Sequence, residues 1–446
     1  MKSLLARRIV PACILSAAAV AALAAPGTAS AALLGKCGGS NIEAAGSSLQ
    51  GVAQDQVWNV DFNKSKAKSA CSGTLKPTVT YKNTSSGKGF EAWDKNLEYG
   101  TLGFIGTDNT VSQTEKEALE AEADGPGTGG TVLTIPTAQS SEAIIANLPA
   151  GCTGNSTVSG ASGRLVMSQK VLEGIYSGSV TNWSQITEGG DELVQKAGGP
   201  TCNKAATITP VVRKDKSGTT HIFKRFLDWT DKEALKTKSG SKTWNELSEL
   251  ENSTLWPEAI TPAEGEKNSG VIERVAATAS SVGYAVMSEA REKGFAPSTG
   301  GANTQTFWVE LESGNKKGRA TYADPSDNGD AAALSNSNCK KTVYTNGKAS
   351  FPPPSVTAPW NEVTTERYSK TYALCGLTYV LALANYAAYE GHGTTQGEAT
   401  TVQNYIAYVT EKKGGQKEIA NHDYLALPSN VLPKGAEGAS LINWEP

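Results

Sequence analysis

Short β-branched and apolar runs alternate with segments of helical periodicity along most of this chain. Residues 207–212 predict a short strand, and the apolar residues that follow recur at the spacing of one helix face: Ile222, Phe223, Phe226 and Leu227. The turn between these elements reads Arg213-Lys214-Asp215-Lys216-Ser217-Gly218-Thr219. A helix that begins there presents unpaired N–H groups and the positive end of its dipole, and both favour a bound anion.

The same strand–turn–helix pattern occurs twice near the N-terminus. A strand before Gly46-Ser47-Ser48 leads into a helix marked by an apolar stripe at Leu49, Val52, Ala53, Val57 and Val60. A second strand at 78–82 leads through the turn 85–89 into a helix face of Phe90, Trp93 and Leu97. A third strand, 102–105, ends at Gly106-Thr107-Asp108-Asn109, and Ser112 with Glu115 predicts a capping box for the next helix.

The rest of the chain continues this alternation. Residues 132–136 begin a second block, and the further expected elements are a strand in 140–148, mostly helix over 165–174, a helix at 271–277 and a strand at 282–286. We expect elaborated loops with short strands over 290–370, a buried strand running into a helix over 377–387, a helix at 401–409 and a short C-terminal tail after 424–428. Strands that alternate with helices in two blocks predict an α/β protein with mostly parallel sheets and two lobes.

The N-terminus has the composition of a secretory signal. Basic residues Lys2, Arg7 and Arg8 precede an apolar run over 9–25, and a small-residue cleavage site ends at Ala31, which predicts a signal peptide over residues 1–31. Removing these three positive charges lowers the formal net charge from −3 to −6. An acidic protein is a poor ligand for a phosphate backbone, so we expect no nucleic-acid partner and an exported, soluble product of about 415 residues.

Six cysteines follow the predicted signal peptide, and an even number in an exported chain favours three disulfides. Sequential pairing closes the shortest loops and predicts the bonds Cys37–Cys71, Cys152–Cys202 and Cys339–Cys375. The sequence contains no C-x-x-C motif and three widely spaced histidines. We therefore expect neither a metal site nor a cofactor.

Three predicted helix N-termini carry a hydroxyl beside glycine or a small residue, at Ser48, Ser86 and Ser217. Each hydroxyl alone is explained by ordinary helix capping. Together they would form a cage of N–H and O–H donors around one small anion, if the fold brings them together. The sequence has neither a G-x-x-x-x-G-K-[ST] phosphate loop nor a G-x-S-x-G nucleophile elbow.

Two carboxylates near these turns have two interpretations each. An ionised Asp108 can only accept hydrogen bonds, so it would favour an oxyanion that still carries a proton, such as hydrogen phosphate, over sulfate. The alternative is a turn residue at a strand end. Asp215 either orients the Arg213 guanidinium through a charge-assisted pair or is a solvated turn carboxylate.

Several ordered motifs resemble those of one family. They are Gly46-Ser-Ser-Leu49, the loop within 81–90, Phe104-Ile-Gly-Thr-Asp108, Val171-Leu-x-x-Ile175-Tyr-x-Gly178-x-x-Thr-x-Trp183, Arg213-x-Asp215-x-Ser217-Gly-Thr219, Val282-Gly-Tyr284 and Tyr424-x-x-Leu427-Pro428. Over most of its mature length the chain resembles the Pst-type phosphate-binding proteins, the solute-binding components of phosphate ABC importers. It departs from the family pattern where Ser48 and Leu49 replace Thr and Phe, and where insertions occupy 113–130, 231–268 and 300–370.

The resemblance implies a binding site shared between two lobes. One lobe would contact phosphate through Ser48, the N–H of Leu49, Ser86 and Asp108, and the other through Arg213, Ser217, Gly218 and Thr219, with Asp215 supporting Arg213. The implied fold is the two-lobed periplasmic-binding-protein (Venus flytrap, type II) fold, with a ligand cleft, hinge strands near 132–138 and 285–290, and disulfide-stabilised insertions. The expected lobes are 36–134 with 288–446, and 135–287.

The function implied by the resemblance is capture of inorganic phosphate outside the cytoplasm and its delivery to the permease subunits of an ABC importer. The protein would then act as a monomer and would catalyse no reaction. Two alternatives stay open: a secreted phosphomonoesterase on the same scaffold, and a binding protein or surface scaffold for another oxyanion or partner. The enzyme would need a nucleophile beside a base, or a metal cluster.

Overall fold

The computed structural model describes most of the chain after the predicted signal peptide. The described residues are 39–64, 77–95, 102–124, 130–154, 165–188, 191–196, 201–231, 244–250, 253–297, 306–316, 319–326, 339, 342–344, 350–357, 360–361, 363–365 and 371–446. The predicted signal peptide and the predicted Cys37–Cys71 disulfide lie outside these residues.

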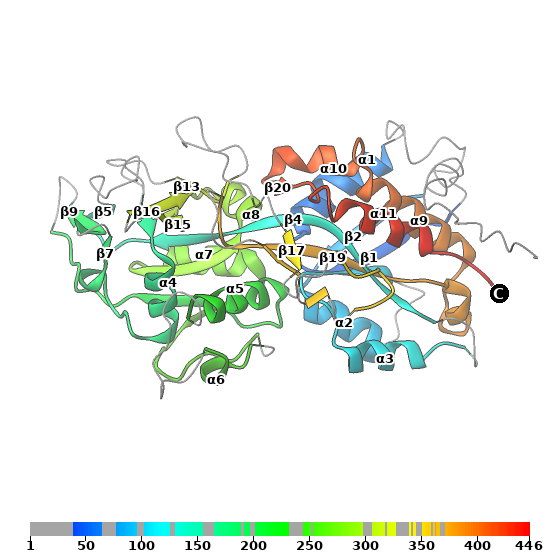
Figure 1. The fold of residues 1–446 in the computed structure, drawn as a ribbon, viewed down its shortest axis with the longest axis horizontal. Helices are drawn as coiled ribbons and strands as arrows, with labels where there is room; N and C mark the ends of the chain where they lie inside the picture. The colour runs from blue at the N-terminus through cyan, green and yellow to red at the C-terminus, as the bar shows by residue number, and fades with distance from the viewer. Residues whose placement is uncertain are drawn as a thin grey trace, which may run out of the picture.

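An 11-stranded mixed sheet runs through both lobes of the protein (Figure 1). Its main path, in spatial order, is β11 (Ala263–Gly265), β10 (Thr209–Arg213), β12 (Ser281–Val286), β4 (Val132–Asn147), β19 (Cys375–Leu383), β3 (Leu102–Thr107), β1 (Ile42–Gly46) and β2 (Val79–Asn83). The strands β1, β2 and β3 are parallel to one another, and so are β10, β11 and β12. Each parallel group belongs to one lobe, as the two sequence blocks predict.

The long strand β4 connects the two lobes. Its first part pairs antiparallel with β19, and its last residues, 142–147, pair antiparallel with β12. The sequence pattern separates 132–136 from 140–148, whereas the structure has one continuous strand across both segments. The interruption in the pattern is Pro136, which lacks an N–H, and the pairing of β4 with β19 shifts register there.

The first lobe has helices on both sides of its strands. They include the π-helix Ala53–Trp58, α1 (Asn59–Asn63), α2 (Ser86–Lys95), α3 (Gln113–Ala121), the 3-10 helix Tyr386–His392, α9 (Gln396–Thr410), α10 (Gly415–Glu418), the 3-10 helix Ile419–His422 and α11 (Leu432–Leu441). The predicted capping box of α3 is confirmed: Ser112 Oγ accepts the Glu115 N–H, and Glu115 accepts the Ser112 N–H. The expected C-terminal tail is wrong, because residues 432–441 form α11 against β4 and α9.

The second lobe packs its helices around β10, β11 and β12. They are α4 (Gln169–Ser177), the 3-10 helix Trp183–Gln185, α5 (Gly218–Trp229), α6 (Trp244–Ser248), α7 (Lys267–Ala277) and α8 (Met287–Glu292). The expected helix over 165–174 is partly wrong, since Val166–Met167 form the strand β6 beside β15 (Glu310–Lys316). The predicted strand and helix around residues 207–227 are both confirmed.

Further short strands and two disulfides complete the fold. The remaining strands are β5 (Cys152–Gly154), β7 (Thr187–Glu188), β8 (Asp191–Glu192), β9 (Val194–Lys196), β13 (Ala296–Pro297), β14 (Thr306–Trp308), β16 (Arg319–Ala323), β17 (Thr342–Tyr344), β18 (Val363–Thr365) and β20 (Tyr424–Leu425). Two predicted disulfides are confirmed: Cys152 bonds to Cys202, and Cys339 bonds to Cys375 at the start of β19.

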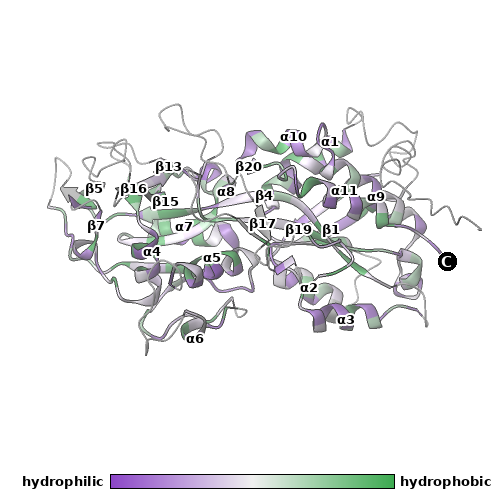
Figure 2. Cartoon of the chain, viewed as in Figure 1, coloured by the Kyte–Doolittle hydropathy of each residue, from purple (hydrophilic) through white to green (hydrophobic). Residues whose placement is uncertain are grey.

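The apolar residues of both lobes lie between the strands and the inner faces of the helices. The polar surface is clearest on α3, which is largely hydrophilic in Figure 2 and lies at the edge of the first lobe. Aromatic side chains fill the second-lobe core, where the rings of Phe223 and Tyr284 stack with centroids 4.2 Å apart. The protein is a two-lobed α/β fold, and the ends of its strands meet at the boundary between the lobes (Figure 1).

Candidate functional site

The first-lobe side of the site begins where β1 ends at Gly46. Gly46 has a φ of +133°, and a Cβ there would lie 2.2 Å from the carbonyl oxygen of Gly106. Only glycine fits this close approach of two strand ends. The chain then turns through Ser47 and Ser48, both buried.

Asp108 follows β3 directly and is 4% exposed. The hydroxyl of Ser47 donates to its carboxylate with Oγ 2.5 Å from each oxygen, and Thr378 Oγ1 donates to Oδ1 at 2.9 Å. Burial raises the pKa of Asp108 to about 6. The two hydroxyl hydrogen bonds limit this rise, as do the charge of Arg213 and the hydroxyl of Thr219.

The helix α2 places Ser86 at its first position. The hydroxyl that caps this helix belongs to Ser85, whose Oγ accepts the Lys88 N–H at 3.3 Å. Ser86 is therefore not needed as the cap. Its Oγ is buried and has no hydrogen-bond partner within the described ranges. A buried hydroxyl without a partner is costly unless a ligand supplies one.

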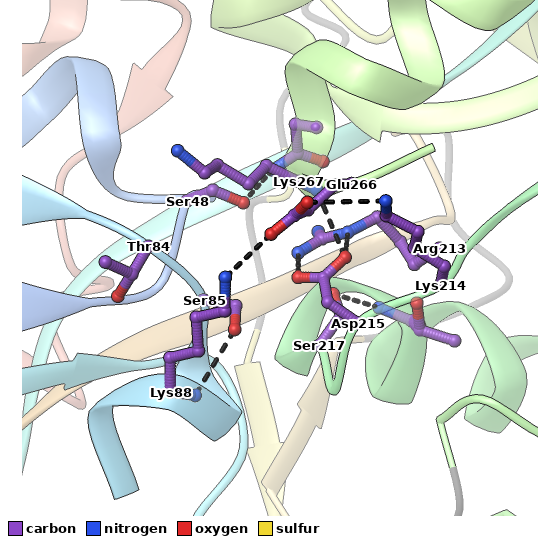
Figure 3. Close-up of polar contacts among 12 residues, drawn as sticks. Ser48, Thr84, Ser85, Lys88, Arg213, Lys214, Asp215, Ser217, Glu266 and Lys267 are labelled. Atoms are coloured by element: carbon purple, nitrogen blue, oxygen red, sulfur yellow. Dashed lines mark hydrogen bonds and ion pairs between the residues drawn. The ribbon is translucent and has the colours of Figure 1, made fainter. Parts of the chain in front are cut away.

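Arg213 ends β10 with its side chain only 1% exposed. Its guanidinium pairs with Asp215 through two hydrogen bonds, from Nε to Oδ1 at 2.8 Å and from Nη2 to Oδ2 (Figure 3). The N–H of Lys267 also donates to Asp215 Oδ1, at 3.1 Å. Burial raises the pKa of Asp215, but the hydrogen bond and the charge of Arg213 lower that pKa by more, so the net result lies below the ordinary value. The remaining nitrogen, Nη1, is buried and meets no acceptor in the part of the chain that the structure describes.

Ser217 is the N-cap of α5. Its Oγ accepts the Thr220 N–H at 3.2 Å, so ordinary capping does describe this hydroxyl. Accepting that bond leaves Ser217 its own proton to donate. Thr219 Oγ1 lies close enough to Asp108 to lower its pKa, but it makes no hydrogen bond of ordinary length and angle to any described residue.

The two lobes touch at this point. A Cβ on Gly218 would lie 2.7 Å from the Cβ of Asp108, so the mouth of α5 lies directly against the end of β3. A few residues away, the N–H of Gly87 on α2 donates to the carbonyl oxygen of Lys216 at 3.2 Å. The structure therefore brings Ser86 and Asp108 of the first lobe beside the 213–219 turn of the second.

Ser48 and Leu49, which the resemblance places on the anion, also form hydrogen bonds within the protein. Ser48 Oγ accepts a hydrogen bond from Asn268 Nδ2 at 3.0 Å, and Asn268 lies on α7 of the second lobe. The N–H of Leu49, expected to face the anion, donates instead to Ser47 Oγ at 3.0 Å. Ser48 thus links the lobes, and Leu49 buttresses Ser47.

Sequence reasoning missed Ser47, Asn268 and Thr378. Ser47 carries the same hydroxyl as its neighbour Ser48, so the motif could have indicated it. Asn268 ends a polar segment without periodicity, and Thr378 lies in an apolar strand. Only the pairing of β19 with β3 and β4 brings Thr378 to Asp108, so no local signal could have identified it.

Ion pairs join the lobes at the solvent-exposed rim of the site. Lys88 of α2 pairs with Glu266 at 2.7 Å, and Glu266 also pairs with Lys214 at 3.4 Å (Figure 3). Lys216 lies 3.8 Å from Glu91 of α2. All these side chains are at least 40% exposed, so each pair contributes little stability alone. Lys88–Glu266 and Lys216–Glu91 are distinguished by their position across the lobe boundary, whereas Lys214–Glu266 lies within the second lobe.

A cavity of about 50 Å³ opens on the α5 side of Asp108. Its lining includes His221, Ile222 and Arg225 of α5, together with Trp360 and Asn361 from the insertion. Ser86 and Arg213 do not line this cavity. It is therefore adjacent to the group of anion-facing donors and separate from it.

No group of three or more His, Cys, Asp or Glu side chains in the described ranges has the arrangement of a metal site. None of the helices in those ranges combines the length and the apolar character that a membrane crossing requires.

The family model described as a PBP superfamily domain matches residues 35–413, so the chain belongs to the PBP superfamily. Its fold is similar to that of a high affinity periplasmic phosphate-binding protein, PfluDING, solved with phosphate at pH 8.5, with a TM-score of 0.55, 18% identity and coverage of 88% of this chain and 92% of that one. It is also similar to a phosphate-binding protein from Stenotrophomonas maltophilia, with a TM-score of 0.56, 20% identity and the same coverage.

One curated relative is an enzyme by name. Alkaline phosphatase L of Pseudomonas aeruginosa (strain UCBPP-PA14) is 30% identical over 125 residues. This match covers 28% of the chain and 26% of that protein, about a quarter of its length.

Proposed function

We propose that this protein binds inorganic phosphate between its lobes, outside the cytoplasm, and delivers it to the permease subunits of an ABC importer. One observation carries the proposal. Two buried donors without a partner in the described ranges, Ser86 Oγ and Arg213 Nη1, lie on opposite lobes beside the buried carboxylate of Asp108. A small oxyanion with both acceptors and a proton satisfies all three groups.

The chemistry of these groups favours a protonated oxyanion. Arg213 supplies a fixed positive charge, held in orientation by Asp215, and the hydroxyls of Ser86, Ser217 and Thr219 supply donors. The N–H groups of Gly218 and Thr219 at the start of α5 add the helix N-terminus. Asp108, when ionised, accepts a hydrogen bond from the O–H of hydrogen phosphate and repels sulfate, which has no proton to donate.

Movement of the two lobes relative to each other would let the anion enter and leave the site. We assign the first lobe to residues 36–134 and the last part of the chain, and the second to residues 135–287 together with α8 and β13 to β16, which pack on it (Figure 1). This moves the boundary expected from the sequence, which placed 288–446 in the first lobe, and the hinge is where β4 passes between the lobes. The signal peptide predicted over residues 1–31 supports export, and the names of the structural relatives support phosphate as the ligand. The residues expected to bind phosphate are Ser48, Leu49, Ser86, Asp108, Arg213, Ser217, Gly218 and Thr219. Ser48 keeps its proton to donate, because its Oγ accepts from Asn268, whereas the Leu49 N–H would have to exchange its bond to Ser47 Oγ for the anion.

A secreted phosphomonoesterase is the second candidate, and the partial match to alkaline phosphatase L favours it. Ester hydrolysis needs an activated nucleophile or a metal cluster. Binding requires only the donors described above, so we prefer binding.

Calorimetric titration of the purified protein with phosphate and with sulfate tests the proposal. We expect tight phosphate binding with one site per chain, much weaker sulfate binding near neutral pH, and loss of phosphate binding in Arg213→Ala. The matched control is Arg274→Ala, which removes an exposed arginine that donates to the carbonyl of Glu264. Equal affinity for both anions would contradict the proposal. Turnover of a chromogenic phosphate ester that disappears in Arg213→Ala would favour the enzyme.

A further inference from the structure

We propose that Ser47 is a specificity-determining residue of the anion site, which acts by holding the Asp108 carboxylate ionised and fixed in orientation. The inference rests on the proposed function, because it assigns to Ser47 control over which oxyanions that site accepts. Ser47 and its neighbour Ser48 carry the same hydroxyl but face different partners. Ser48 contacts Asn268 across the lobe boundary, whereas Ser47 contacts Asp108 within the first lobe.

The hydroxyl of Ser47 both donates and accepts hydrogen bonds within the protein. Its proton bridges the two oxygens of Asp108, each 2.5 Å from Oγ, and Oγ accepts the Leu49 N–H at 3.0 Å. Ser47 is fully buried, so water does not compete for these bonds. Because this hydroxyl donates its single proton in hydrogen bonds to the carboxylate, Ser47 is a positioning residue and not itself a donor to the anion.

Thr378 supplies a second hydroxyl from another element. Its Oγ1 lies 2.9 Å from Asp108 Oδ1 and accepts a hydrogen bond from Gln50 Nε2 at 2.7 Å. A carboxylate has about four acceptor positions, so the two hydroxyls leave room for a proton from the ligand. They also fix the plane of the carboxylate before a ligand arrives.

These bonds decide the protonation state of Asp108. Burial favours the neutral acid, and each hydroxyl that donates to the carboxylate favours the ionised form. A neutral Asp108 carries a proton that it can donate to sulfate, and it no longer repels sulfate by charge. Without Ser47, Asp108 would become neutral at a higher pH, and the exclusion of sulfate would fail at that pH.

Other charged and titratable groups surround Asp108. They are Arg213 of β10, Tyr81 of β2, Tyr379 of β19, Tyr424 of β20, and His221 and Arg225 of α5. Burial raises the pKa of each of the three tyrosines above its usual value, so they stay neutral, and arginine stays charged. His221 lines the cavity beside Asp108, and histidine side chains ordinarily titrate in this pH range. The experiment must therefore separate His221 from Asp108.

Sulfate is the suitable probe because it stays fully deprotonated between pH 5 and 8, so only the protein titrates. Sulfate and phosphate affinities are measured by calorimetry over this range for the wild type, Ser47→Ala and Ser47→Cys. Sulfate binding to the wild type should strengthen as the pH falls through about 6, where Asp108 takes up a proton. In Ser47→Ala we expect the midpoint of this pH dependence to be about one pH unit higher. The ratio of phosphate to sulfate affinity at pH 7 should be about tenfold smaller.

Three variants complete the test. Ser47→Cys keeps a weak donor of similar volume, and we expect an intermediate shift, which also covers a failure of Ser47→Ala to fold. Ser141→Ala removes another buried hydroxyl, which donates to the Pro325 carbonyl at 2.6 Å, and should leave the midpoint unchanged. In the third variant, His221→Gln, the shift caused by Ser47→Ala should persist.

The outcomes separate this inference from the proposed function. A wild type that binds phosphate, with an unchanged midpoint and preference in Ser47→Ala, overturns the role of Ser47 and leaves the proposed function intact. A shift that vanishes in His221→Gln assigns the pH dependence to His221 and also overturns the inference. A wild type that binds neither anion contradicts the proposed function itself.

Discussion

Gly218 at the start of α5 lies directly against Asp108 at the end of β3, so that a Cβ on Gly218 would be 2.7 Å from the Cβ of Asp108. The two residues are 110 positions apart in sequence and belong to different lobes. The N-terminus of α5 can approach the carboxylate this closely only because position 218 has no side chain. This contact places Asp108 of the first lobe directly against the second-lobe part of the proposed anion site.

Gly218→Ala should therefore weaken phosphate binding by opposing closure of the lobes. The residue lies in the first turn of a helix, where alanine is favourable, so we expect no loss of fold stability. We expect at least a tenfold loss of affinity by calorimetry, on the order of 1.4 kcal/mol. Gly154→Ala is the control, since a Cβ there would meet no atom closer than 3.5 Å. Unchanged affinity in Gly218→Ala would show that the lobes do not need this contact.

Asp215→Asn should weaken phosphate binding although it removes a negative charge near an anion. The carboxylate accepts from both Nε and Nη2 of Arg213, and an amide can accept at only one atom. We expect about a tenfold loss of affinity, because the guanidinium is no longer held in one orientation. Lys214→Ala, which removes an exposed partner of Glu266, serves as the control. Tighter binding in Asp215→Asn would mean that charge repulsion outweighs positioning.

Lys88→Glu should speed the release of phosphate by placing two carboxylates across the rim of the site. Lys88 pairs with Glu266 of the other lobe, and both side chains are exposed, so we expect an effect of about two- to fivefold at low salt. The difference should disappear in high salt. Stopped-flow fluorescence measures the release rate. Lys293→Glu reverses an exposed pair within the second lobe and should leave the rate unchanged. A salt-independent change would argue against an ion-pair origin.

Glu398 should make the unfolding free energy fall as the pH rises. Burial raises its pKa to about 8, from an ordinary value of 4.5 in the unfolded chain. Between these values the folded protein holds a proton that the unfolded chain has lost, so stability is highest at low pH and declines toward pH 8. Glu398→Gln should be more stable than the wild type at pH 8.5, by about 1–2 kcal/mol, and similar at pH 5. Chemical denaturation at both pH values measures this.

Glu117→Gln is the control for that measurement, since Glu117 is an exposed residue on α3. It should leave the pH dependence of unfolding unchanged. If Glu398→Gln retains the full pH dependence of the wild type, other buried carboxyls account for it. Glu173 and Glu289, whose pKa values burial raises to about 7, would then be the next to test.

The features that sequence predicts well here are local. The capping box of Ser112 and Glu115 lies within four residues, and the strand and helix around Arg213 follow from periodicity. The two disulfides followed from loop length alone. The cap, the strand and the helix depend on neighbours in the chain, whereas the disulfides join cysteines 50 and 36 positions apart that are consecutive only in the order of cysteines.

The features that sequence misses depend on tertiary contacts. Helix α11 contains Gly435 and Gly438, which weaken any helix prediction, yet a Cβ on Gly438 would lie 2.7 Å from Ile135 of β4. Close packing on the sheet therefore explains these glycines. Thr378 looks like a core strand residue until β19 places it beside Asp108. The two halves of the proposed site likewise come from different lobes, and they meet only in the folded protein.

The most direct test of the account compares phosphate with sulfate binding in Asp108→Asn at pH 8, where Asp108 of the wild type is ionised. The amide can donate a hydrogen bond to sulfate and no longer repels it by charge. We predict that the ratio of phosphate to sulfate affinity, measured by calorimetry, falls by about 10- to 100-fold, the worth of one hydrogen bond to a charged group. An Asp108→Asn protein that rejects sulfate by the same ratio as the wild type would contradict the account.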